Sequence, residues 1–295
     1  MSDERPTVRP VTLARLVEIA HLCGGEQRTT EDIETELDVS HRRARSAILE
    51  ASRIALVEEV DDDLYDSTAV GDSFVEAIQD ENWSRVNSIL ETRSPHYGAF
   101  IDVVESEGPI TLEDALVSLE DDSEFTPYTY NQASVEVLGD WAGRLGVVQR
   151  NAFTGEYYMT EGDSIPASFE HALLQVYDDL EETAGVGMRQ RYLSIPEVRE
   201  ELCSRLGATR DAFDAALDEL AQQNVGKLEL SGAPVDTGAK EASYGIKTMA
   251  LSDDDGLVST AQSTERVMAG IEQFGKQYYY LTVHDRDLTY TTHEQ

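Results

Sequence analysis

Cysteine and long apolar runs are both scarce in this sequence. Its 295 residues include only Cys23 and Cys203, which lie far apart among apolar neighbours, so neither a disulfide framework nor a metal cluster is indicated. No apolar run approaches the roughly 20 residues that span a bilayer, and the first residues lack a basic segment followed by an apolar one. We therefore expect a soluble, cytoplasmic protein with free thiols, without a metal, a cofactor or a membrane partner.

Positive charge is scarce as well. Lysine and arginine total 23 against 58 aspartates and glutamates, which gives a formal net charge of -35. The carboxylates interrupt regular apolar periodicity along the whole chain, a pattern typical of a solvated acidic surface on folded domains rather than of a disordered tail. Such a surface resembles that of proteins from extreme halophiles, which accumulate molar salt in the cytoplasm. At ~1 M salt the screening length is only ~3 Å, so the net charge does not exclude a nucleic-acid partner.

Catalytic motifs are missing from the sequence. It has no phosphate-binding G-x-x-x-x-G-K-[ST] loop, no H-E-x-x-H zinc motif, no G-x-S-x-G nucleophile motif and no paired C-x-x-C. The six histidines are scattered without the spacing of metal ligands. We therefore expect a protein that is not an enzyme.

Apolar periodicity and helix caps predict three helices and a hairpin in the first 68 residues. Thr29 or Thr30 is placed to cap the second helix, and Ser40 is placed to cap the third. The expected helices cover 11–22, 30–37 and 40–54, and the hairpin begins with a strand at 56–60 and turns at 61–63.

A similar order of elements recurs after Ser94-Pro95, which ends a pair of predicted linker helices. In the next stretch, Thr111 caps a helix and two strands flank a turn at Thr154-Gly155. In the last stretch, Thr209 caps a helix, and an insertion with a helix near 259–270 separates two strands. The predicted strand pairs are 146–150 with 156–159, and 227–230 with 278–283.

These patterns predict a mainly α fold with small β-hairpins, of the α+β class, in two or three tandem domains. The first predicted domain has a basic helix, and the last has an insertion in its hairpin. The predicted segments are a first domain at 1–68, linker helices at 69–93, a second domain at 94–163 and a third domain at 164–295.

The predicted helix 40–54 carries three arginines within four residues, although cations are rare in this chain. At about 100° per residue its alanine-rich stripe faces one way, and most of its polar side chains lie opposite. Arginine can grip phosphates or bond bidentately to guanine. The alternative is that these arginines pair with carboxylates such as Glu31, Glu34 and Glu50. The predicted DNA-contacting residues are Ser40, Arg42, Arg43, Arg45, Ser46 and Arg53.

Two further groups are candidates for secondary contacts with DNA. The neutral side chains before and at the start of a helix in the second domain could bond adenine, but could equally belong to a protein contact or to the core. Two arginines of the third domain could contact the DNA backbone. These residues are Tyr128, Tyr130, Asn131 and Gln132 in the second domain, and Arg189 and Arg191 in the third.

The helix of the third domain that follows Thr209 is acidic, with Asp211, Asp214, Asp218 and Glu219, so we do not expect it to enter a DNA groove. Several arginines of this domain are spaced to form intrahelical ion pairs with glutamates. These arginines are Arg199, Arg205 and Arg210, and the glutamates are Glu197, Glu200 and Glu201.

The run Thr30–Val60 resembles the winged helix-turn-helix superfamily of DNA-binding regulators in archaea and bacteria, and the whole chain resembles haloarchaeal proteins with two or three such modules. The resemblance implies a recognition helix at 40–54, a wing at 56–64 and a tendency to bind double-stranded DNA. Because such regulators often read two half-sites, it also implies a homodimer or protein partners bound through 69–93 and the second and third domains. The wing departs from the usual pattern, since an acidic wing cannot grip phosphates in the ordinary way.

We therefore expect a non-enzymatic DNA-binding protein, either a transcriptional regulator or a genome-associated factor. The alternative is an adaptor whose winged helices hold other proteins in a chromosome-maintenance or genome-defence complex. The sequence suits that use because only the first of its three predicted modules carries a basic helix.

Overall fold

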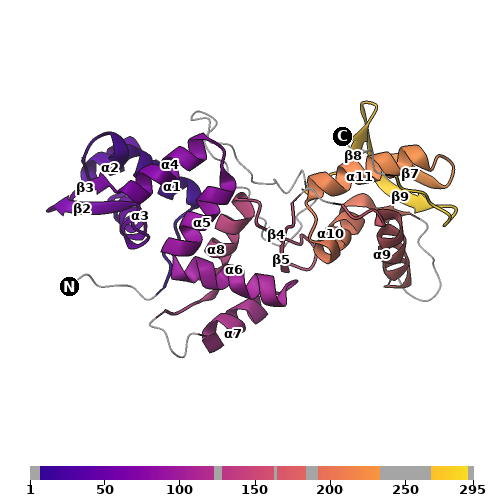
Figure 1. Ribbon diagram of the computed structural model, residues 1–295, viewed down its shortest axis with the longest axis horizontal. Coiled ribbons are helices and arrows are strands. Elements are labelled where there is room, and N and C mark those ends of the chain that lie inside the picture. The colour runs from indigo at the N-terminus through magenta and orange to yellow at the C-terminus, as the bar shows by residue number, and fades with distance from the viewer. Residues whose placement is uncertain (1–6, 123–127, 163–164, 184–191, 233–266, 292–295) are drawn as a thin grey trace. The chain divides into compact units, whose positions relative to one another are not determined.

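The computed structural model describes residues 7–122, 128–162, 165–183, 192–232 and 267–291. Helices dominate these residues, and the strands form small antiparallel sheets, so the mainly α, α+β class is confirmed (Figure 1). The chain divides into two compact units. Unit 1 extends to Val148 and unit 2 begins at Gln149.

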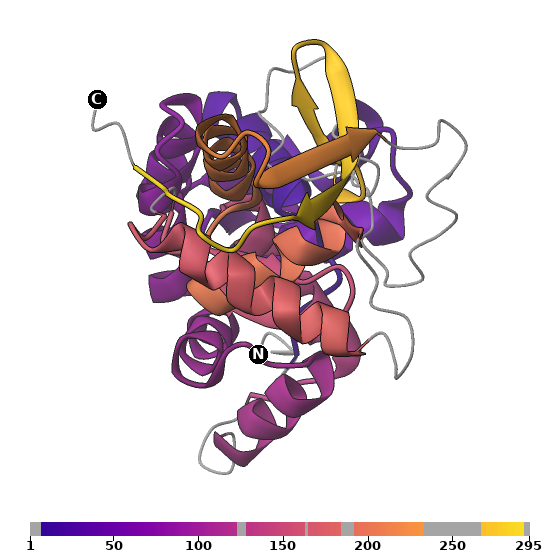
Figure 2. The same cartoon turned by 90° about the vertical axis from the view of Figure 1, so that its right-hand side faces the viewer.

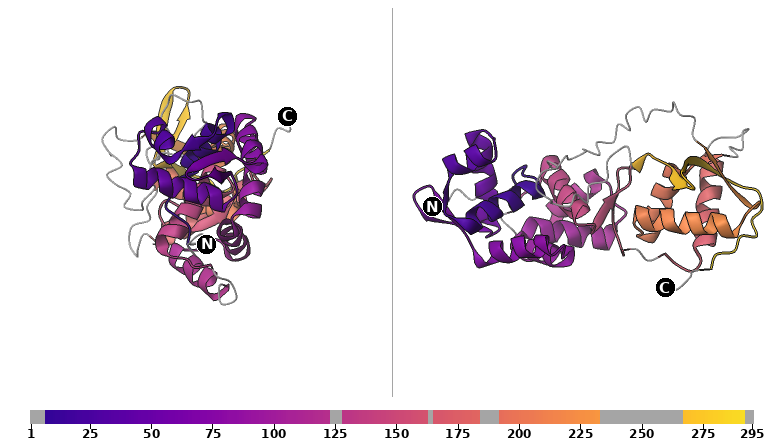
Figure 3. Two further views of the ribbon diagram at one scale, coloured as in Figure 1. Left: turned by 90° about the vertical axis from the view of Figure 1, so that its left-hand side faces the viewer. Right: turned by 90° about the horizontal axis from the view of Figure 1, so that it is seen from above.

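The first part of unit 1 combines three helices with a small sheet. Thr29 is the N-cap of the second helix and forms a reciprocal capping box with Asp32, as the cap pattern predicts. The three strands pair in the order β1-β3-β2. The left view of Figure 3 turns these indigo elements toward the reader. The elements are α1 (Leu13–Gly25), β1 (Arg28–Thr29), α2 (Thr30–Glu36), α3 (His41–Arg53), β2 (Val57–Asp61) and β3 (Leu64–Ser67).

Five further helices complete unit 1, and the predicted linker helices pack inside it. Phe74, Val86 and Leu90, from the apolar stripe proposed for dimerisation, are fully buried, with α4 against α1 and α5 against α6. A Cβ atom at Gly71 would lie 2.1 Å from the backbone oxygen of Leu56, so only glycine allows this approach of α4. The helices are α4 (Ala69–Gln79), α5 (Trp83–Arg93), α6 (Pro95–Glu107), α7 (Leu112–Asp122) and α8 (Gln132–Arg144).

Unit 2 contains a hairpin, three helices and a second sheet. The sheet has the order β6-β9-β7, with β8 paired to one end of β9. The predicted pairing of the strands near 228 and 281 is confirmed, because Leu230 lies opposite Leu281. The elements are β4 (Val148–Arg150), β5 (Tyr157–Met159), α9 (Phe169–Thr183), β6 (Leu193–Ser194), α10 (Ile195–Leu206), α11 (Arg210–Gln223), β7 (Leu228–Gly232), β8 (Ile271–Gln273) and β9 (Lys276–Val283).

The core of unit 2 lies between its helices and its sheet, and Figure 2 faces this end of the chain. The rings of Phe169 and Phe213 meet edge to face at 5.9 Å in this core, and Leu281 of the central strand is fully buried beside them. Of the helix predicted near 259–270, residues 259–266 lie outside the described residues.

Apart from Val148, the hairpin β4–β5 groups with unit 2, whereas the prediction assigned it to the domain at 94–163. The linker helices group with unit 1 rather than standing between domains. Sequence periodicity located these elements, but their grouping depends on contacts with residues far away in the chain.

Candidate nucleic-acid interface

Helix α3 presents one buried side and one polar side. It begins after Ser40, and its buried residues Ala44, Ala47, Ile48 and Ala51 face the core of unit 1. Ser40 occupies the N-cap position as predicted, but its hydroxyl makes no capping hydrogen bond. The serine hydroxyl is therefore available to a partner at the start of the helix.

The three clustered arginines lie on the polar side of α3, as predicted. Arg42, Arg43 and Arg45 are exposed, and Ser46 is partly exposed. Within the part of the chain that the structure describes, no side-chain hydrogen bond or ion pair engages these three guanidinium groups. Three unpaired cations on one helix stand out against the net charge of -35.

Two of the three neighbouring carboxylates that could have neutralised these arginines have other partners. Glu34 Oε2 lies 3.1 Å from His41 Nδ1. Glu50 is fully buried and pairs with Arg53 and Arg9. Of the predicted alternative pairings, the structure contains the one between Arg53 and Glu50. Arg42, Arg43 and Arg45 make no such pair among the described residues.

Arg53 differs from the other predicted DNA contacts. Its side chain is only 14% exposed and binds the Glu50 carboxylate, and its Nη1 lies 3.2 Å from His96 Nδ1 on α6. Burial raises the pKa of Glu50, although Arg53 and Arg9 oppose the rise. The helical wheel places Arg53 on the side of Arg42, but His96 of α6 contacts its side chain, and no local pattern reveals this contact.

The hairpin beside α3 is acidic, as the sequence indicates. Glu58, Glu59 and Asp61 are exposed along β2. Asp63 has a structural task, because its carboxylate accepts hydrogen bonds from the backbone N–H and the hydroxyl of Thr30 at the start of α2. The exposed carboxylates of this hairpin would repel phosphates, so α3 has to supply the attraction.

The candidate residues before α8 make contacts within unit 1. The rings of Tyr128 and Tyr130 pack edge to face against buried His96, with centroids at 4.9 and 5.1 Å. Asn131 is the N-cap of α8 and accepts a hydrogen bond from Ser134 N at 2.9 Å. Gln132 is exposed, and its Nε2 lies 3.4 Å from Glu136 on the same helix. The structure thus explains three of the four by packing or capping. Arg189 and Arg191 lie outside the described residues.

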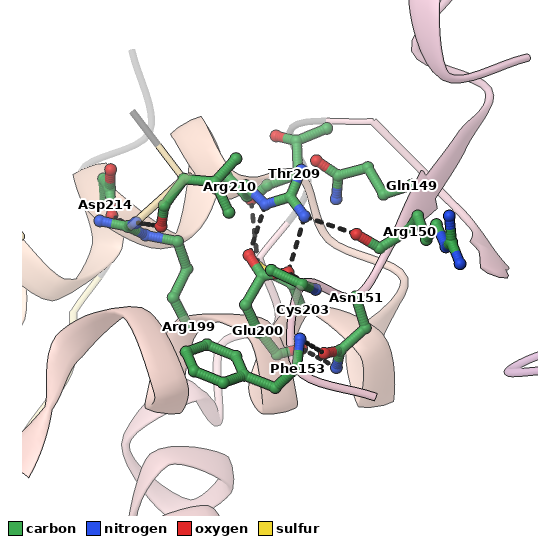
Figure 4. Close-up of polar contacts among 12 residues, drawn as sticks. Gln149, Arg150, Asn151, Phe153, Arg199, Glu200, Cys203, Thr209, Arg210 and Asp214 are labelled. Atoms are coloured by element: carbon green, nitrogen blue, oxygen red, sulfur yellow. Dashed lines mark hydrogen bonds and ion pairs between the residues drawn. The ribbon is translucent and has the colours of Figure 1, made fainter. Parts of the chain in front are cut away.

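Unit 2 uses its arginines internally, as Figure 4 shows. Arg210 is 8% exposed, binds the fully buried carboxylate of Glu200 and donates from Nη2 to Arg150 O at 2.7 Å. The same carboxylate accepts from Ala152 N at 2.7 Å. The turn after β4 is therefore anchored on α10 and α11 by a buried ion pair.

The predicted intrahelical pairs of this region form only in part. Arg205 does bind Glu201 one turn away, at 2.7 Å. Arg199, however, is 1% exposed and pairs with Asp214 of α11 at 2.7 Å. Arg199 also donates to two backbone oxygens beyond the insertion, so it joins three segments of unit 2.

No model of a known protein family matches the chain, and no curated protein matches it. Among the described residues, no helix is both long and apolar enough to cross a membrane. The same residues contain no group of three or more histidine, cysteine or acidic side chains arranged to hold a metal ion.

Proposed function

We propose that residues 7–68 form a winged helix-turn-helix and that the protein is a non-enzymatic, DNA-binding regulator or genome-associated factor. The order of three helices and a hairpin, with a short turn between α2 and α3, supports this proposal. The observation that carries it is the set of three exposed, unpaired arginines on α3. Their positions match the N-terminal part of a recognition helix, from which base contacts are made.

The position of each side chain around α3 determines whether it can contact bases or phosphates. At about 100° per residue, Arg42, Arg45 and Ser46 share one side of the helix, while Arg43 lies on its flank. The two arginines on the central side can reach base edges, where a guanidinium bonds bidentately to guanine O6 and N7. Arg43 and the Ser40 hydroxyl are placed to contact phosphates on either side of the groove.

The acidic surface limits the salt concentrations at which the protein can bind DNA. At ~1 M salt, charges farther apart than ~3 Å are largely screened, so the carboxylates of β2 repel duplex DNA only weakly. Short contacts between guanidinium and phosphate or base persist better, because they involve direct hydrogen bonds. We therefore expect binding at molar KCl and stronger repulsion at low salt.

A charge-reversal pair tests the proposal. Arg45→Glu and Arg93→Glu change the net charge equally, and Arg93 is an exposed residue at the end of α5 in the same unit. Duplex binding is measured by fluorescence anisotropy at molar KCl, with circular dichroism to verify folding. We expect Arg45→Glu to weaken binding by at least about tenfold, from the loss of roughly 1.4 kcal/mol or more, and Arg93→Glu to leave it nearly unchanged. Absence of binding by the wild type would refute the proposal.

The second candidate function is a protein-interaction adaptor, and the anchoring of β4–β5 favours it. A hairpin whose turn is held by Glu200 and Arg210 cannot act as a free wing for DNA. Helix α11, with Asp211 and Glu219, presents like charge to phosphate. On this proposal unit 2 contacts proteins. Deletion of residues 149–295 would then spare DNA binding, provided that residues 1–148 remain folded by circular dichroism.

A further inference from the structure

The β8–β9 hairpin of unit 2 ends in an exposed aromatic residue. Gln273 and Lys276 are register partners, so Phe274 and Gly275 form a two-residue turn, with φ angles of 51° and 72°. Phe274 is 86% exposed, the highest value among the large apolar side chains that the structure describes. Figures 1 and 2 both show this hairpin projecting beyond the helices of unit 2.

Both properties of Phe274 oppose the stability of the isolated chain. Turns with positive φ at both positions favour Asn-Gly, because a bulky side chain is strained in the left-handed region. The exposed ring also keeps apolar area in water. Strain at an exposed position points to a contact outside the hairpin. Next to this ring, Lys276 is exposed and makes no ion pair with any residue of the described ranges.

Unit 1 carries a groove of matching size. A cavity of about 420 Å³ lies along the end of α1 and beside α4, and its lining includes the apolar side chains of Ala20, Leu22 and Val75. Gly24 and Gly25 form one wall, and no atom lies within 4 Å of the position that a Cβ of Gly25 would take, so the wall is open to an approaching backbone. The cavity has room for a phenyl ring.

The acidic residues that line this groove are complementary to the lysine of the β8–β9 tip. Asp72 makes no ion pair within the described chain, whereas neighbouring Glu76 already binds Arg85 at 3.0 Å. Arg28 also lines the groove, and its Nη2 lies 3.6 Å from Glu26 Oε2. A lysine ammonium beside Asp72 would pair with its carboxylate. His21 also lines the rim and is exposed.

We propose that the β8–β9 tip of one copy docks into the α1–α4 groove of a second copy. Phe274 fills the apolar floor and Lys276 approaches Asp72. Different surfaces of the two copies meet, so the contact closes as a two-fold dimer where it forms reciprocally and otherwise builds larger rings or open chains. Duplex DNA fits this tip poorly, since Glu272 is exposed on β8 and Gln273 binds Asp218 of α11.

Sedimentation of the full chain without DNA at molar KCl tests the contact. One small anchor implies weak binding, so the concentration series has to reach the highest soluble values. The wild type is expected to gain mass with concentration, and Phe274→Asn to weaken association at least about tenfold with an unchanged or higher melting temperature, because Asn suits the turn. Val225→Thr changes a residue 83% exposed in the same unit and serves as the control. A wild type that stays monomeric overturns the proposal.

A photocross-linker at the β8–β9 tip identifies the surface that the tip contacts. This experiment does not depend on how the Phe274→Asn variant associates. Benzoylphenylalanine replaces Phe274 in a mixture of ¹⁴N- and ¹⁵N-labelled chains, and cross-linked peptides are identified by mass spectrometry. Mixed-isotope links to residues 20–28 or 72–79 are expected. Links confined to one isotope, or mixed links to other regions, overturn the proposal. The contact does not depend on DNA binding by α3, so failure of either leaves the other intact.

Discussion

Arg42 and Arg210 both lie in the first turn of a helix, Arg42 in the basic helix α3 and Arg210 in the acidic helix α11. Arg42 is exposed, with no side-chain partner among the described residues, whereas Arg210 is 8% exposed and binds buried Glu200. The difference lies in the neighbours. A buried carboxylate one helix away fixes an arginine in the core, and its absence leaves the charge to solvent or a ligand. Arginine content alone therefore does not identify a binding surface.

The largest expected effect comes from removing the carboxylate that fixes Arg210. Glu200→Ala leaves a buried guanidinium and the N–H of Ala152 without their partner, which costs about 3–5 kcal/mol. Amide hydrogen exchange of α10 and α11 in the full chain at molar KCl measures the loss. Glu201→Ala, which removes the partly exposed partner of Arg205, is the control and is expected to cost less than ~1 kcal/mol. Equal losses in the two variants would contradict a buried anchor.

The next effect separates Arg53 from the other arginines of α3. Arg53→Ala removes a charge-assisted contact with Glu50 and is expected to destabilise unit 1 by about 1.5–3 kcal/mol, while the folded variant keeps its DNA affinity. Arg45→Ala should show the reverse, with stability changed by no more than ~0.5 kcal/mol. Tryptophan fluorescence reports this unit, because Trp83 and Trp141 both lie in it. If the folded Arg53→Ala variant lost affinity for DNA, Arg53 would have to be a DNA-contacting residue.

The smallest effect concerns the pH dependence of Glu50. Burial raises its folded pKa above the ordinary value of 4.5, so its folded form binds a proton more readily than its unfolded form. Its contribution to stability is therefore full below that ordinary value and is lost as pH rises through the folded pKa. Accordingly, the difference in unfolding free energy between wild type and Glu50→Gln should fall as pH rises from about 4.5. A difference that is flat or rises with pH would contradict the raised pKa.

Local sequence signals predicted much of this fold. The Thr29 cap, the polar side of α3 and the positions of strands β7 and β9 follow from residues near one another or from simple alternation. The burial of Arg53 beneath α6 does not, because it depends on a residue 43 positions away. The bond from Ala152 N to Glu200 likewise joins residues 48 positions apart. Apolar periodicity predicts which side of a helix or strand is buried, but it does not predict which other element packs against that side.

The most direct test of the central proposal is the salt dependence of duplex binding by the full chain. The logarithm of the association constant is measured against that of the KCl concentration for the wild type and for single alanine variants of Arg42, Arg43, Arg45 and Arg93. If α3 enters a groove, each lost phosphate contact makes the negative slope shallower by about 0.9. Loss of a base contact lowers affinity for some sequences more than others, and Arg93→Ala changes neither. If the four variants behave alike, or if the wild type does not bind duplex DNA, α3 is not the DNA-binding surface.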